Sequence, residues 1–143
     1  MSLFTCLLIA LGGALGTIAR YLVSVATRPI SQHIPWGTIG INVSGSFVIG
    51  LFGTLTLANG RFPVSENTRL FVMIGLCGGY TTFSSFSLQT LDLLRSGAML
   101  RASVNVLGSV ILCILAVGLG HAIAARFNDH AVQIAQLDIE ERG

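Results

Sequence analysis

The sequence predicts an all-α integral membrane protein with four transmembrane helices. Of its 143 residues, 52% are hydrophobic and only 10% are charged, and the mean hydropathy is +0.80. Soluble domains contain roughly 25% charged residues. A helix of about 20 apolar residues is long enough to cross the hydrocarbon core of a bilayer. Four stretches of this chain meet that requirement, so little is left except short loops and a tail.

The predicted spans cover residues 3–26, 36–58, 68–94 and 98–125. The first span could be mistaken for a secretory signal, but residues 1–13 contain no Lys or Arg and the apolar residues continue past Gly16. Small residues at helix-packing spacing occur in the first two spans, as at Gly12 and Gly16. We therefore expect one transmembrane domain, residues 1–125, followed by a solvated polar tail, residues 126–143.

A run of small and polar residues interrupts the third span, GGYTTFSSFS from Gly78 to Ser87. A bilayer core offers no water to backbone or hydroxyl groups, so this run indicates a polar path lined by protein. Two glycines followed by several hydroxyl residues also tend to break or bend a helix. The carbonyls freed by a break need partners, which can be a cation, ordered water or a neighbouring helix.

The polar residues placed at depth are neutral hydrogen-bond donors, and none of the six acidic residues lies in the middle of a span. Phe83 and Phe86 share a helical face, and the edge of an aromatic ring carries the positive end of its quadrupole. Rings beside hydroxyl and amide donors favour a small anion over a cation. Taken singly, each such residue is an ordinary packing residue of a membrane helix. The donors are Asn42, Thr81, Thr82, Ser84, Ser85, Asn105 and Ser109.

The basic residues are eight arginines, divided equally between the two sides of a four-span protein. Orientation in a membrane follows the distribution of loop cations, so an even division permits insertion both ways up and pairing with an inverted copy. With only eight arginines, an even division can also arise by chance. Four helices scarcely enclose a polar path, which favours a homo-oligomer. One side would hold Arg61, Arg69, Arg126 and Arg142, and the other Arg20, Arg28, Arg95 and Arg101.

Other classes of protein fit less well. A proton-coupled exporter of cationic drugs needs an intramembrane carboxylate, and a cation channel prefers acidic rings. An enzyme is not expected, because the three histidines, His33, His121 and His130, have no evident nucleophile or metal partner. A dual-topology small-molecule exporter or a non-conducting accessory membrane protein remains the alternative. The cysteines, Cys6, Cys77 and Cys113, are isolated in apolar surroundings.

The chain resembles the Fluc (CrcB-type) fluoride channels across all four spans. The resemblance is carried by GALGTIARY from Gly13, WGTIGINVSGSFVIG from Trp36, GLCGGYTTFSSFS from Gly75 and NVLGSVILC from Asn105. It implies a multi-pass protein of the bacterial inner membrane that forms an antiparallel, dual-topology homodimer with two pores. It also implies passive, highly selective export of fluoride from the cytoplasm, which reduces fluoride toxicity.

The resemblance also implies roles for individual residues. Arg20 would give a positive field at the pore mouth. The backbone carbonyls of Gly78 and Thr81 would hold a structural Na⁺ at the dimer centre. The pore itself would be lined by Asn42, Phe83, Phe86, Ser84, Ser85, Ser109 and Cys113.

Three positions depart from the family pattern. Gln89 stands where many members carry Glu, and Asn105 where relatives often carry Tyr. Cys113 replaces a hydroxyl residue at the end of the polar track on the fourth helix, and a thiol is a weak hydrogen-bond donor. This chain is therefore expected to differ most from the family at the fourth-helix positions.

Overall fold

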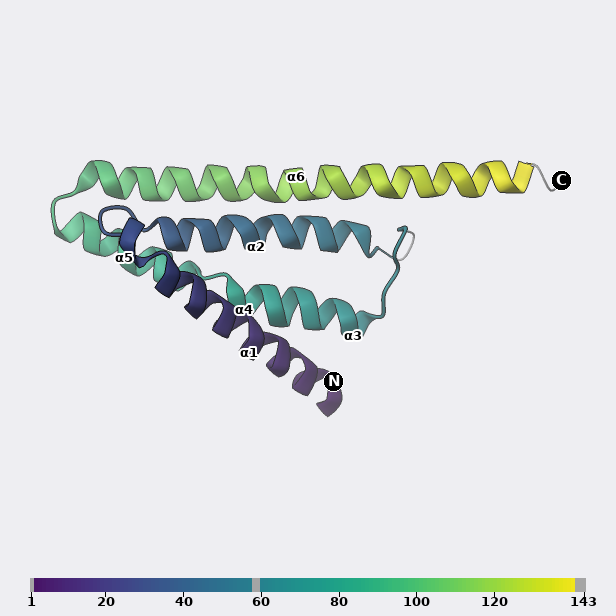
Figure 1. The fold of residues 1–143 in the computed structure, drawn as a ribbon, viewed down its shortest axis with the longest axis horizontal. Helices are drawn as coiled ribbons and strands as arrows, with labels where there is room; N and C mark the ends of the chain where they lie inside the picture. Colours follow the sequence, from purple (N-terminus) through teal and green to yellow (C-terminus); the bar gives the residue numbers. More distant parts are fainter. Residues whose placement is uncertain (1, 58–59, 141–143) are drawn as a thin grey trace.

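The computed structural model describes residues 2–57 and 60–140, with side chains as far as residue 128. Every element in these ranges is helical (Figure 1). The first two spans are α1 (Leu3–Ala26) and α2 (Trp36–Leu55), joined through the short helix η1 (Arg28–Ile30). The third is built from four pieces, α3 (Glu66–Arg69), η2 (Leu70–Cys77), α4 (Gly78–Tyr80) and α5 (Phe83–Arg95). The fourth is α6 (Met99–Glu140).

Four helical segments are long and apolar enough to cross a membrane, Leu3–Ala26, Trp36–Leu55, Glu66–Arg95 and Met99–Asn128. The predicted all-α fold with four membrane spans is therefore confirmed. Helix α6 continues without interruption through the predicted boundary at residue 125 as far as Glu140. The division of the chain into a membrane domain and a polar tail stays a prediction, and Arg142 lies outside the described residues.

Helix α2 is sandwiched between α6 on one side and the third span on the other, while α1 crosses the first half of the third span obliquely (Figure 1). Glycine makes the contact with α1 possible. A Cβ added at Gly79 would lie only 3.0 Å from the Cα of Gly13, and one at Gly16 only 2.9 Å from the amide nitrogen of Tyr80. Such backbone contact between membrane helices requires small residues.

An arginine ties the start of the third span to the end of α2. The Arg69 guanidinium donates to the carbonyls of Gly53 at 3.1 Å and Thr56 at 2.9 Å, and to the Thr56 hydroxyl at 2.7 Å. The last carbonyls of a helix have no partners within it, and a cation there also complements the helix dipole. Arg69, counted above only among the charges on one side of the membrane, thus caps α2.

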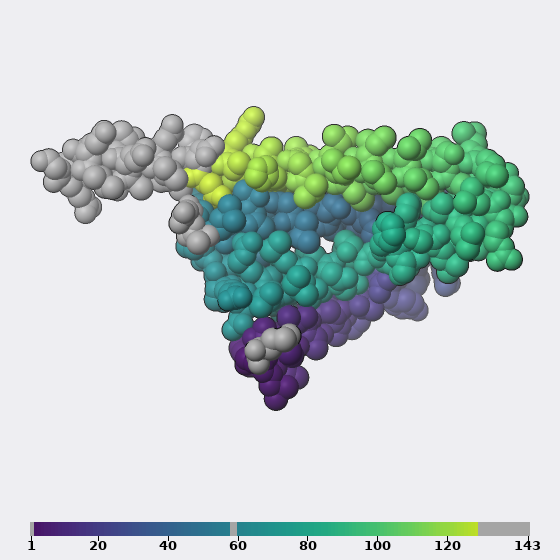
Figure 2. Space-filling model, turned by 180° about the vertical axis from the view of Figure 1, so that it is seen from behind, coloured from purple at the N-terminus to yellow at the C-terminus, as the bar shows by residue number. Residues whose placement is uncertain are grey.

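Much of the helical surface faces outward. Between 11% and 22% of each apolar span window is buried inside the chain. Figure 2 shows α1 along the lower edge of the molecule, away from α6. Its exposed apolar residues include Leu7, Leu11, Leu15 and Leu22. These faces therefore have the surface expected for contact with lipid or with another membrane-embedded chain.

Candidate functional site

The third span breaks at two threonines. Thr81 and Thr82 both have extended backbone, with φ −77° and ψ 158° at Thr81 and φ −152° and ψ 109° at Thr82. Helix α4 ends at Tyr80 just before them, and α5 begins at Phe83 just after. The Thr82 hydroxyl caps α5 by accepting from the Ser85 N–H at 3.2 Å. The predicted break is confirmed, and it lies within the polar run.

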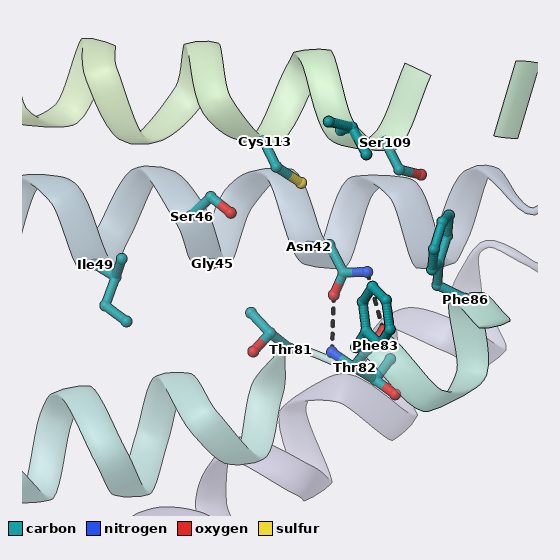
Figure 3. Close-up of a pocket in the computed structure, with 11 residues that line it drawn as sticks. Asn42, Gly45, Ser46, Ile49, Thr81, Thr82, Phe83, Phe86, Ser109 and Cys113 are labelled. Carbon is teal, nitrogen blue, oxygen red and sulfur yellow. Dashed lines mark hydrogen bonds between the residues drawn. The ribbon is translucent and has the colours of Figure 1, made fainter. Parts of the chain in front are cut away.

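Asn42 of α2 pairs with both backbone groups of Thr82. Its Oδ1 accepts from the Thr82 N–H at 2.8 Å, and its Nδ2 donates to the Thr82 carbonyl at 3.1 Å (Figure 3). A single side chain therefore satisfies the donor and the acceptor of this extended residue. The sequence leaves a cation, ordered water or a neighbouring helix as possible partners for freed backbone groups. For Thr82 the partner is a side chain of the neighbouring helix α2.

The same hydrogen bonds divert two donors from their ordinary helical acceptors. In a continuous α-helix, the Thr82 N–H would donate to the Gly78 carbonyl and the Ser85 N–H to the Thr81 carbonyl. Here the Thr82 N–H donates to Asn42 and the Ser85 N–H to the Thr82 hydroxyl. The carbonyls of Gly78 and Thr81 thus lose their usual helical donors at the break. These are the two carbonyls for which sequence resemblance implied a cation.

A cavity of about 300 Å³ lies beside the break, between α2, α5 and α6 (Figure 3). It brings together five of the predicted pore residues, Asn42, Phe83, Phe86, Ser109 and Cys113. Sequence reasoning missed Gly45, Ser46, Ile49 and Val110, which also line it. Ser46 could have been found from its position one helical turn after Asn42. Every residue lining this cavity is uncharged.

The two phenylalanines differ in their surroundings. Their ring centroids lie 5.3 Å apart with a tilt of 43° between the planes, within the range of favourable aromatic pairs. The Phe86 side chain is only 9% exposed, whereas Phe83 is 79% exposed. A single chain therefore covers one ring and leaves the other at its surface.

Ser109 provides a buried hydroxyl that has no partner within the described residues. It is 6% exposed, and its Oγ forms no hydrogen bond there. An unpaired buried hydroxyl costs about 1–3 kcal/mol relative to a satisfied one. Because Ser109 lines the cavity beside Phe86, a ligand that accepts hydrogen bonds could use this donor. Cys113, one helical turn further along α6, is partly exposed on the same side.

Of the remaining predicted site residues, Ser85 and Arg20 line a second cavity, of about 280 Å³. The Ser85 hydroxyl accepts from the Thr82 hydroxyl at 3.0 Å. The Ser84 hydroxyl lies 3.3 Å from the same Thr82 oxygen and lines neither cavity. Arg20 and Gln89 share the second cavity with Ser85, and the Oε1 of Gln89 is buried without a partner in the described chain. Thr82 borders both cavities.

Asn105 differs from the other predicted donors. It is completely buried, at 0% exposure, and lines neither of the two cavities at the break. Its Nδ2 donates to the Thr90 hydroxyl at 2.8 Å, which joins α6 to α5. This departure from the family pattern therefore lies within the interface between two helices.

The fold and the site define a class of protein. The chain is a multi-pass membrane protein in which a broken helix borders an uncharged, largely apolar cavity with a few hydroxyl groups, an arrangement used for ion or solute sites within membranes. In the described part of the spans, acidic side chains occur only near the ends, at Glu66 and Asp92.

Comparisons with known proteins identify the family. The model of the family described as "CrcB-like protein, Camphor Resistance (CrcB)" matches residues 7–121. A fluoride-specific ion channel FluC from Methylobacterium radiotolerans is 73% identical over 143 residues, the whole of both chains. The FluC of Gluconobacter oxydans is 72% identical over 142 residues, 99% of each chain, and that of Methylocella silvestris is 59% identical over 121 residues, covering 84% of this chain and 92% of the relative. The chain belongs to the CrcB-like family, as its motifs predicted.

The pairing of Asn42 with Thr82 predicts a stability effect. Replacing Asn42 by Leu leaves a buried donor and a buried acceptor unpaired, so we expect the free energy of unfolding to fall by at least about 2 kcal/mol. Thermal unfolding of the purified protein in detergent measures the change. Ser46→Ala, on the same helix and lining the same cavity, is the matched control. Equal unfolding temperatures for the two variants would show that the pairing contributes no stability.

Proposed function

We propose that this chain is a passive, selective fluoride channel. The observation that carries the proposal is the Ser109 hydroxyl, buried without a partner in the described chain and placed beside Phe86 in an uncharged cavity. The amide NH₂ group of Asn42 and the ring edges of Phe83 and Phe86 carry further partial positive charges. Fluoride is small and a strong acceptor, so it suits this set of donors. The naming of relatives as fluoride-specific channels supports the same function.

Passive conduction is sufficient for export. Hydrogen fluoride crosses bilayers as a neutral acid, dissociates near neutral pH and leaves the anion trapped in the cytoplasm. A pore releases that anion down its electrochemical gradient, assisted by an interior-negative potential worth about 2.3 kcal/mol per 100 mV for each charge. Neutral donors bind the ion weakly enough for it to leave. Chloride, which is larger, fits a narrow path of such donors less well.

The proposal includes an antiparallel homodimer with two pores, in the inner membrane of a bacterium. Phe83 supports it, because this ring lines the cavity and is 79% exposed, so on that side only lipid would face an anion, and lipid cannot donate hydrogen bonds. A partner in the inverted orientation would supply a protein surface on that side for both pores. The even distribution of arginines is compatible with insertion in both directions.

We further propose a structural Na⁺ at the centre of the dimer, held by the carbonyls of Gly78 and Thr81. The diversion of their helical donors to Asn42 and Thr82 supports this assignment, because freed carbonyls are suitable ligands for a hard cation. The ion would neutralise the carbonyl dipoles at the break and would not be transported.

Flux from proteoliposomes tests the function directly. Vesicles are loaded with fluoride or chloride, valinomycin supplies the potassium counter-current, and ion-selective electrodes follow release. We expect rapid fluoride release with little chloride release. Equal release of both anions would contradict selectivity for fluoride. No release from a folded dimer would favour a non-conducting accessory membrane protein. Binding of a lipophilic cation in place of fluoride flux would favour the exporter.

The aromatic rings are expected to contribute to conduction. Replacing Phe83 or Phe86 by Leu removes a ring edge that would stabilise the anion, so fluoride flux should fall by roughly threefold to tenfold. Gel filtration checks that each variant keeps the oligomeric state of the parent. Phe62→Leu, an exposed loop residue outside both cavities, is the control. Normal flux through both pore variants would reduce the rings to packing elements.

Sodium is expected to stabilise the assembled protein. A ligand that binds only the folded state adds about 2.7 kcal/mol when its concentration is 100 times its Kd. The unfolding temperature should therefore rise with Na⁺ concentration at constant ionic strength, with N-methylglucamine as the replacing cation. An unfolding temperature that is independent of Na⁺ across the millimolar range would contradict the site.

A further inference from the structure

A relay of two hydrogen bonds connects α6 to the backbone of Phe86. The Thr90 hydroxyl donates to the Phe86 carbonyl at 2.8 Å, and the same oxygen accepts from the Nδ2 of Asn105 at 2.8 Å. The relay therefore begins on a fully buried residue of α6 and ends at the residue whose ring lines the cavity. Both bonds have near-optimal lengths.

The donor half of the Asn105 amide alone takes part in this relay. Its Oδ1 is buried and has no partner in the described chain, which is unfavourable in a buried site. A Leu of similar size would fill the space without that penalty. The amide therefore destabilises the interface through its oxygen while providing a directional link through its nitrogen. Simple filling of the α5–α6 interface does not account for this arrangement.

The relay lies one helical turn from the cavity on both helices. Asn105, Ser109 and Cys113 are spaced by four residues and so share one face of α6. Ser109 and Cys113 line the cavity, whereas Asn105 lies outside it and contacts Thr90. A tie at Asn105 therefore holds the Phe86 segment of α5 at a set position relative to the Ser109 hydroxyl one turn away.

We propose that Asn105 and Thr90 are positioning residues that hold the Phe86 ring in register with the Ser109 hydroxyl. This inference rests on the proposed function, since the ring and the hydroxyl are taken there as fluoride contacts. Neither residue touches the ion. Loss of the relay allows α5 to shift relative to α6, which weakens fluoride conduction and its selectivity over chloride without dissociating the protein.

The decisive variant is the double substitution Thr90→Val with Asn105→Leu. It removes the relay and leaves no unpaired polar group behind, so its effect on folding should be small. Thr90→Ser keeps the hydroxyl and both hydrogen bonds and serves as the matched control. We expect fluoride flux through the double variant to fall by about threefold to tenfold, with a lower ratio of fluoride to chloride flux. Thr90→Ser should stay within about twofold of the parent.

A second readout does not depend on conduction. The protein is labelled with 4-fluorophenylalanine, and the Phe86 signal in the ¹⁹F spectrum is assigned from the Phe86→Leu variant. The double variant should shift or broaden that signal, and Thr90→Ser should leave it in place. If the parent does not conduct, the proposed function fails, but the spectra still test the positioning.

Three results would overturn the inference. The first is a double variant with the flux, the selectivity and the Phe86 signal of the parent. The second is a Thr90→Ser variant as impaired as the double variant, because the hydroxyl would then not be the group responsible. A fall in unfolding temperature with unchanged selectivity and an unchanged signal would assign the relay to stability alone, which also contradicts positioning.

Discussion

The hydrogen-bonded pair between Asn42 and the backbone of Thr82 is the interaction on which the site depends. A helix can break inside a bilayer only if other groups replace the lost backbone hydrogen bonds, since each unsatisfied group costs several kcal/mol there. The Asn42 amide has a donor and an acceptor side by side, and it pairs with both groups of Thr82. Without this partner a continuous helix would be the favourable state for the third span.

Two consequences follow from the break. The first is that α5 begins at Phe83, in the interior of the span, so the positive end of its dipole lies beside the cavity. The second is that the carbonyls of Gly78 and Thr81 lose their helical donors. One event in the backbone thus produces a weakly positive environment for an anion and a set of freed oxygens for a cation. No charged side chain lines the first cavity, and Arg20 lies across the break in the second.

Much of this architecture could be predicted from the sequence, because hydropathy determines span positions and glycines with hydroxyl residues favour a broken helix. The residue at which the chain breaks could not be predicted. Gly79 suggested flexibility, yet it lies in α4, where it permits close contact with Gly13. The pairing of Asn42 with Thr82 joins residues 40 positions apart, and no local pattern indicates it. From the sequence, Asn105 is counted among the donors of the polar path. It lies in the interface between α5 and α6 instead, and this depends on the rotation of α6 relative to α5, which the sequence does not give.

The two phenylalanines define what a single chain leaves incomplete. Phe86 is buried within the chain and lines the cavity together with Ser109, so a single chain forms this part of the cavity lining. Three residues earlier, Phe83 lines the same cavity but is 79% exposed. Lipid could cover an apolar ring, but it could not supply hydrogen bonds to an anion passing beside it. A fluoride path along these rings therefore requires a second protein surface opposite Phe83. The proposed inverted copy meets this requirement with the same residues, so each chain would complete the pore of the other.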